Sequence, residues 1–142
     1  MIQKDKELLL CDLCARLPYG VKVKFGNDVI PSPLTPHLLD NYWYMVDIYL
    51  KPYLRPMSSM TKEEKEELLN LLFDKESKNF YIDEEGFIDG KTSDLMKDGL
   101  NYPSFCPINI VLYTDWLNAH HFDYRGLIEK GLALEAPNGM YK

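Results

Sequence analysis

The sequence predicts an α+β fold, a single domain over residues 1–142 in which helices pack on a small antiparallel sheet. A chain of 142 residues has the length of one domain, and a hydrophobic content of 46% is sufficient for a buried core. Segments with helical periodicity and segments with strand alternation are both present. They do not follow the regular β-α-β order that produces a parallel sheet, so an antiparallel sheet covered by helices is favoured.

The first part of the chain is expected to form a helix, a strand and a proline-rich edge. Residues 4–17 have apolar residues at helical spacing, and Pro18 with Gly20 ends this helix. The alternating sequence VKVKF at 21–25 predicts a half-buried strand. Three prolines in PSPLTP at 31–36 remove backbone donors, which restricts that stretch to a loop or a sheet edge. The apolar stripe of the helix consists of Leu10, Leu13, Cys14 and Leu17.

The clearest strand signal is the aromatic sequence YWYMVDIYL at 42–50. A period of two divides it into two faces, because successive side chains of a strand point in opposite directions. The face expected in the core consists of Tyr42, Tyr44, Val46, Ile48 and Leu50. The opposite face consists of Trp43, Met45, Asp47 and Tyr49.

The middle of the chain is expected to add a capped helix and a hairpin. Thr61 and Glu64 have the spacing of a capping box, which predicts a helix that continues to about Phe73. The sequence NFYIDEEGFIDG at 79–90 predicts two short strands around a Glu-Glu-Gly turn. One or two helical turns are expected at 93–99, between a serine cap and a terminating glycine.

Two helices are expected near the C-terminal end. Pro107 suits the start of a helix over about 108–121, although 108–114 alone also fits a strand. Asp123 is expected to cap a short second helix, which Gly131 closes.

The sequence TDWLNAHHFDYRGL at 114–127 places two histidines between two aspartates and suggests a reactive site. On a helix, however, Asp115 lies about 140° from His120, so the two side chains cannot share a metal ion or a proton. The adjacent His120 and His121 diverge by about 100°. We therefore expect His120 at the edge of the core with a hydrogen-bond partner, His121 at the rim, and Asp123 in a capping role.

Composition and charge predict a cytoplasmic protein. The net charge of −6 and the pI of about 5.0 oppose binding to nucleic acid or to anionic membranes. No apolar run approaches the ~18 residues of a membrane span. The first residues mix acids with apolar side chains and lack the pattern of a signal peptide. Three cysteines, an odd number, fit thiols that are kept reduced.

The cysteines allow a metal-dependent alternative. Cys11 and Cys14 form a CxxC motif, and Cys106 with His120 or His121 would complete a Cys3His zinc site. No second closely spaced ligand pair supports such a site. A zinc enzyme or a zinc-stabilised domain is therefore an alternative to the favoured interpretation, which involves no catalytic residue and no cofactor.

The favoured function is that of a small interaction or accessory protein with an aromatic binding patch. The patch is predicted to contain Trp43, Tyr49, Tyr53 and Arg55, because tryptophan, tyrosine and arginine are enriched at interaction hot spots. The competing interpretation is that a helix covers this face of a central strand. Full burial of Trp43 by the chain itself would exclude the patch. A second alternative is a nucleic-acid-binding accessory protein that uses residues near Lys51, Arg55 and Lys62.

Three stretches, DLCARLPYGVK (12–22), KPYLRPMSSMTKEE (51–64) and DWLNAHHFDYRGLIEKGLALEAPNGMY (115–141), resemble small uncharacterised proteins of gut Bacteroidales and of their phages or mobile elements. Together they cover somewhat over a third of the chain. The resemblance implies a cytoplasmic protein encoded by a bacterium or a phage. No activity, ligand or catalytic residue comes with it.

Overall fold

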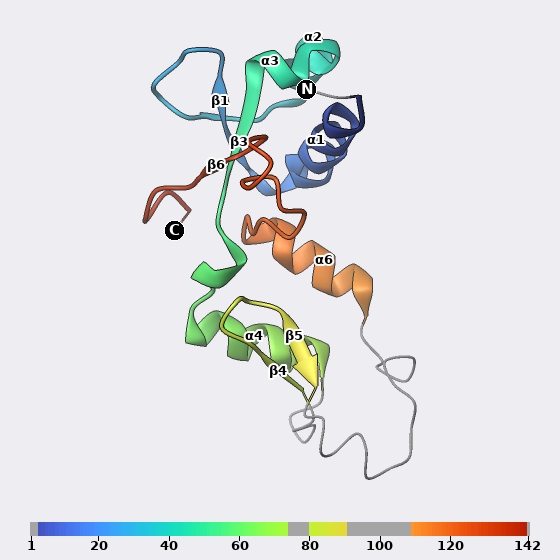
Figure 1. Cartoon of the computed structure of the whole chain (residues 1–142), viewed down its shortest axis with the longest axis vertical. Coiled ribbons are helices and arrows are strands. Elements are labelled where there is room, and N and C mark those ends of the chain that lie inside the picture. The colour runs from blue at the N-terminus through green and yellow to red at the C-terminus, as the bar shows by residue number, and fades with distance from the viewer. Residues whose placement is uncertain (1–2, 74–79, 91–108, 142) are drawn as a thin grey trace. The chain divides into compact units, whose positions relative to one another are not determined.

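The computed structural model describes residues 3–73, 80–90 and 109–141, which belong to two compact units (Figure 1). The terminal unit combines the residues up to Pro56 with those from Leu117 onward, and the middle unit spans Met57–Trp116. Helices and small sheets are both present, so the predicted α+β class is confirmed. None of the described helices has the length and apolar character needed to cross a membrane.

The terminal unit is built on a four-stranded sheet with the order β2-β1-β3-β6. β1 (Lys22–Phe25) pairs antiparallel with both β2 (Ser32–Pro33) and β3 (Leu50–Leu54), whereas β6 (Leu134–Glu135) joins β3 in parallel. The predicted strand at 21–25 is confirmed. Ser32 and Pro33 of the proline-rich stretch form one of the two edge strands, as expected for a stretch in which prolines remove backbone donors.

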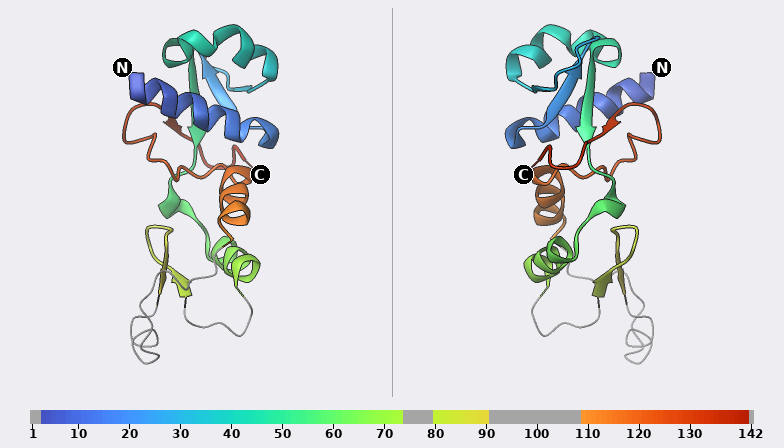
Figure 2. Two further views of the ribbon diagram at one scale, coloured as in Figure 1. Left: turned by 90° about the vertical axis from the view of Figure 1, so that its right-hand side faces the viewer. Right: turned by 90° about the vertical axis from the view of Figure 1, so that its left-hand side faces the viewer.

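Helices precede and connect these strands. α1 (Gln3–Arg16) crosses one face of the sheet and is followed by a single 3-10 turn at Leu17–Tyr19 (Figure 2). α2 (Pro36–Tyr42) begins at Thr35, whose hydroxyl accepts a hydrogen bond from the Leu38 amide at 3.1 Å. A 3-10 turn at Trp43–Met45 and α3 (Val46–Tyr49) complete the connection to β3.

The prediction of a strand at 42–50 is therefore wrong, because all of this stretch except Leu50 is helical. The Thr35 cap and Pro36 in the first turn of α2 start a helical path that continues through it. Val46 in α3 and Leu50 at the start of β3 are both fully buried, as expected from the sequence, but they belong to different elements. Tyr44 and Ile48, which were expected in the core, are more than half exposed.

The core of the terminal unit lies between α1 and the apolar face of the sheet. It also receives side chains from the C-terminal segment. The buried face of α1 differs from the predicted stripe, since Cys14 is exposed and two charged residues, Asp12 and Arg16, are fully buried. The buried core residues are Leu9, Leu13, Val21, Val23, Leu34, Val46, Leu50, Leu54, Leu127, Leu132 and Ala133.

The middle unit contains the predicted capped helix and hairpin. α4 (Lys62–Leu72) has the complete capping box between Thr61 and Glu64. β4 (Phe80–Ile82) and β5 (Ile88–Gly90) form an antiparallel hairpin, and α4 is preceded by a 3-10 turn at Met57–Ser59. α6 (Ile110–Ala119) begins in this unit and shows that 110–114 is helical. The helical turns predicted at 93–99, Cys106 and Pro107 lie outside the described residues.

Candidate binding surface and pocket

One face of the β1–β3 pair is basic. The register pairs Val23 with Pro52 and Lys24 with Lys51, so alternate residues of the two strands share a face. The apolar residues that alternate with them, such as Val23 and Leu54, point into the core. The other set, which we call the basic face, consists of Lys22, Lys24, Lys51, Tyr53 and Arg55, all partly exposed.

The three lysines of the basic face have no acidic partner in the sheet. Across the described part of the chain, no ion pair involves Lys22, Lys24 or Lys51. Glu135 is the only acidic residue in the four strands, and it pairs with Leu54, whose side chain belongs to the apolar face. A protein with a net charge of −6 therefore concentrates four cations on one sheet face.

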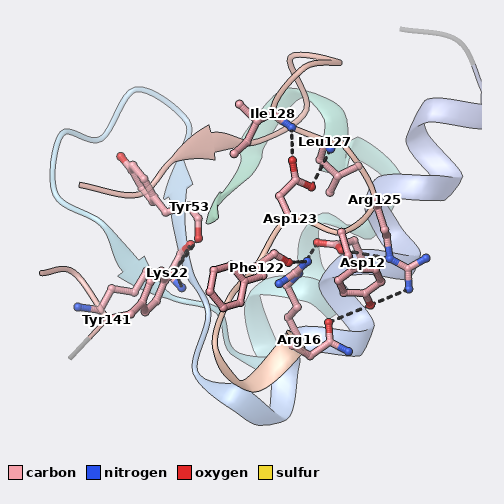
Figure 3. A network of polar contacts seen from close by, with 12 residues as sticks. Asp12, Arg16, Lys22, Tyr53, Phe122, Asp123, Arg125, Leu127, Ile128 and Tyr141 are labelled. Carbon is pink, nitrogen blue, oxygen red and sulfur yellow. Dashed lines mark hydrogen bonds and ion pairs between the residues drawn. The ribbon is translucent and has the colours of Figure 1, made fainter. Parts of the chain in front are cut away.

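Tyr141 joins the two strands at the end of this face. Its hydroxyl accepts a hydrogen bond from the Lys22 amide at 2.9 Å and donates one to the Tyr53 carbonyl at 2.7 Å (Figure 3). Burial raises the pKa of Tyr141 to about 12, so the hydroxyl keeps the proton that it donates. The C-terminal segment is thereby fixed to the strand pair next to Lys22.

His121 lies in contact with Tyr141 and has an unusual backbone. Its φ of 65° is in the left-handed region, and its ring stacks on the Tyr141 ring with centroids 3.6 Å apart. The predicted position at the rim is wrong, because the residue is only 8% exposed. Its Nδ1 is buried without a hydrogen-bond partner among the described residues. His120 is partly buried, as expected for the edge of the core.

A pocket of about 390 Å³ opens at this end of the basic face. All of its lining residues belong to the terminal unit, and none of them is acidic. Two cations, an aromatic hydroxyl group and two imidazoles give the lining its polar character, and a methionine and an alanine add apolar surface. The lining residues are Lys22, Arg55, Ala119, His120, His121, Met140 and Tyr141.

The pKa of His121 predicts a measurable pH dependence. Burial, together with the positive charge of Arg16 and of other nearby groups, lowers this pKa from 6.5 to about 4. Between pH 6.5 and about pH 4, His121 binds a proton in the unfolded chain but not in the folded protein. The free energy of unfolding therefore decreases as the pH falls through this range. We expect a contribution of about 1–2 kcal/mol, because the ring keeps some access to solvent.

Urea denaturation of the wild type and of His121→Asn, from about pH 7 to about pH 4.5, measures this contribution. Asparagine tolerates the positive φ and does not titrate, so the variant should lose less stability on acidification. His37, His120 and all carboxylates are common to both proteins and cancel in the difference. Parallel pH curves for the two proteins would show that His121 does not carry the effect.

A buried ionic cluster supports the segment that carries the histidines. Asp12 and Arg16 are fully buried, and Arg16 Nε donates to Asp12 Oδ2 at 2.8 Å. Arg16 Nη2 donates to the Phe122 carbonyl at 2.6 Å, which ties α1 to the residue after His121 (Figure 3). Arg125 Nε lies 3.2 Å from Asp12 Oδ1, within range of an ion pair but without the alignment of a hydrogen bond.

Asp123 orders the next turn through its side chain. Its Oδ1 accepts from the Leu127 amide at 2.8 Å and its Oδ2 from the Ile128 amide at 2.9 Å. The predicted short helix up to Gly131 is wrong, because these residues form consecutive turns. The carboxylate thus caps backbone amides as expected, but in a turn and not at a helix start.

The four residues of the predicted aromatic patch are divided by the structure. Tyr53 and Arg55 lie together on the basic face, and the Arg55 guanidinium lies over the Phe122 ring at 4.2 Å. Trp43 is 55% exposed in the turn between α2 and α3. The Tyr49 ring packs instead on Phe25, with centroids 5.9 Å apart, at the edge of the core.

The predicted zinc ligands do not come together where they are described. Cys11 and Cys14 are exposed on α1, and Cys106 lies outside the described residues. Within the described ranges, no three histidine, cysteine, aspartate or glutamate side chains form a group that could hold a metal ion. Lys62, proposed with Lys51 and Arg55 as a nucleic-acid contact, belongs to the middle unit.

Comparison with known proteins adds no relative: no family model fits the sequence, and neither a curated protein nor a solved structure matches it.

Proposed function

We propose that the protein is a small accessory protein that binds an acidic segment of another protein on its basic face. The observation that carries this proposal is the set of four cations on one sheet face of an acidic chain. Tyr53 lies between Lys51 and Arg55 on the same face, and tyrosine and arginine are residue types that dominate binding energy at protein interfaces. Charge complementarity therefore favours an acidic partner.

Nucleic acid is the alternative partner for such a surface, but it fits less well. Four cations support at most about four phosphate contacts, whereas salt-sensitive DNA-binding proteins make about 6–10. The net charge of −6 also repels a long polyanion beyond the edges of the face. The four residues of β1 span about 13 Å, a length that a few residues of an extended acidic peptide can follow.

The exposed Trp43 remains a candidate contact outside the basic face. It is not covered by the described part of the chain, and Tyr44 and Ile48 are also more than half exposed. Tyr49 is not included, because its ring packs at the edge of the core. Trp43→Ala is therefore included in the test below as a separate variant.

The test compares a labelled poly-glutamate peptide of about ten residues with a single-stranded DNA of about 20 nucleotides. Fluorescence anisotropy gives the affinity of the full chain for each at about 0.15 M salt. We expect the peptide to bind more tightly than the DNA. The double variant Lys24→Glu with Lys51→Glu should lower the affinity for the peptide by roughly ten-fold or more. The matched control is Lys4→Glu with Lys130→Glu, which makes the same change in net charge at exposed positions away from the sheet.

Tighter binding of the DNA, lost in the Lys24/Lys51 variant, would replace this proposal with the nucleic-acid alternative. Equal weakening by the two double variants would show that only the overall charge matters, and the proposal would then be wrong. Loss of peptide binding in Trp43→Ala, with an unchanged circular dichroism spectrum, would extend the contact surface to that residue.

A further inference from the structure

The pocket beside Tyr141 has the chemistry of an anion site. Lys22 and Arg55 come from different strands, and both line it. Lys22 is next to the Val23–Pro52 pair and thus opposite Tyr53, so Arg55 is its diagonal neighbour on the same face. Two cationic residues therefore line one cavity that has no acidic lining residue.

Arg55 is held in place before any ligand arrives. Its amide donates to the His121 carbonyl at 2.8 Å, and its own carbonyl accepts from the Asp123 amide at 2.8 Å. The guanidinium lies over the Phe122 ring, and its Nη1 donates to the His120 carbonyl at 3.4 Å. A cation that is already positioned loses little conformational freedom on binding, which favours affinity for a small ligand.

The size and the remaining walls of the pocket indicate an organic ligand. A bare phosphate ion fills the space of about two or three waters, roughly 60–90 Å³, whereas the pocket measures about 390 Å³. The volume falls within the range of small-molecule sites, about 300–1,000 Å³. Ala119 and Met140 provide apolar wall on which the non-ionic part of such a ligand can pack.

A phosphate group matches the two cations better than a carboxylate does. A phosphate monoester carries a charge close to −2 at neutral pH, which two cations balance. The planar guanidinium of an arginine can bind two of its oxygens at once, and a lysine adds a compact point charge. A carboxylate, with one negative charge, would leave a net positive charge in the cavity.

From this geometry we propose that the pocket binds a phosphate monoester, with Lys22 and Arg55 holding the phosphate group and Met140 and Ala119 contacting its organic part. This inference goes beyond the proposed acidic partner: the pocket shares Lys22 and Arg55 with the basic face, but Lys24 and Lys51 do not line it, so the two proposals are tested with different variants. The phosphate group belongs either to a free small molecule or to a phosphorylated side chain of a protein.

Isothermal titration of the full chain tests the proposal with defined probes. The probes are glycerol 3-phosphate, a short phosphoserine peptide, the same peptide without phosphate, and succinate as a dicarboxylate of similar charge. We expect saturable binding of at least one phosphate compound below about 10 mM, at about 0.15 M salt. The unphosphorylated peptide and succinate should bind at least about ten-fold more weakly.

Lys22→Gln should weaken phosphate binding by roughly ten-fold or more, because it removes a charged contact. Lys130→Gln is the matched control, since it removes the same charge at an exposed position that belongs neither to the pocket nor to the basic face. Arg55→Gln is the second variant, and its circular dichroism spectrum shows whether loss of the contact with Phe122 disturbs the fold. A variant that retains the wild-type spectrum and loses phosphate binding supports the site.

The comparison of probes then identifies the source of the phosphate group. Tighter binding of glycerol 3-phosphate indicates a free small molecule, and tighter binding of the phosphopeptide indicates a modified protein. The proposal is overturned if neither phosphate compound binds, if succinate binds as tightly, or if Lys130→Gln weakens binding as much as Lys22→Gln. None of these outcomes affects the poly-glutamate test, which changes Lys24 and Lys51.

Discussion

Asp12→Ala is expected to lower the free energy of unfolding of the terminal unit by about 3–5 kcal/mol. Arg16 is fully buried, and its nearest counter-charge is the Asp12 carboxylate at 2.8 Å. Without that carboxylate, the Arg16 charge stays in the core, and the Phe122 carbonyl is its only remaining hydrogen-bond acceptor among the described residues. Equilibrium urea denaturation, followed by circular dichroism, measures the loss.

The cost of the buried pair also predicts how the variant can be rescued. Burial raises the pKa of the Asp12 carboxyl, although Arg16 and Arg125 act in the opposite direction, so desolvation outweighs pairing. Replacing both partners by apolar residues of similar size, Asp12→Leu with Arg16→Met, should therefore recover much of the loss. Arg125→Ala is the control, since that side chain is 28% exposed and its removal should cost less. A change below about 1 kcal/mol in Asp12→Ala would contradict this account.

Gly86→Ala is expected to destabilise the middle unit by about 2–5 kcal/mol. Gly86 has a φ of 89°, and a Cβ atom there would lie 2.1 Å from the Met57 carbonyl oxygen. Backbone occupies that space, so the turn of the hairpin must move away from Met57. The fluorescence of the buried Trp116 reports unfolding of this unit most directly in a Trp43→Phe background, where it is the only tryptophan.

Gly126→Ala separates the effect of the clash from that of the backbone conformation. Gly126 also has a positive φ, 72°, but nothing lies within 4 Å of the position that its Cβ would occupy. Its replacement should cost only about 1–2 kcal/mol, the strain of a left-handed alanine. If Gly86→Ala and Gly126→Ala lowered the free energy of unfolding equally, the contact with Met57 would not explain the effect at Gly86.

Much of the local structure follows from local signals. The capping box at Thr61 and the turn at Gly86 place a helix and a hairpin correctly, because both depend on residues that are close in sequence. The alternation of aromatic residues in 42–50 predicts a strand wrongly, because the helix that starts at the Thr35 cap continues through most of this stretch and β3 begins only at Leu50. The face of α1 that contains Asp12 is not predicted, since only distant residues make a buried charge tolerable.

The candidate site was predictable only in part. Tyr53 and Arg55 were identified by residue type, and the two lysines of VKVKF already indicate one charged strand face. The contact of Tyr141 with Lys22 and Tyr53 joins residues that are far apart in the sequence, so no local sequence pattern predicts it. A helical wheel places His121 wrongly, because α6 ends at Ala119 and the positive φ of His121 itself takes the chain out of the helical periodicity.

The order of the two units along the sequence has a consequence for the synthesis of the chain, because the middle unit separates the two segments of the terminal unit. All residues of the middle unit, Met57–Trp116, are synthesised before the second segment of the terminal unit, which begins at Leu117. The N-terminal strands must therefore wait, with their apolar face incomplete, until Leu127, Leu132 and Ala133 arrive. During that interval the nascent chain exposes hydrophobic surface, which makes chaperones relevant to its production and truncation before residue 127 damaging to its solubility.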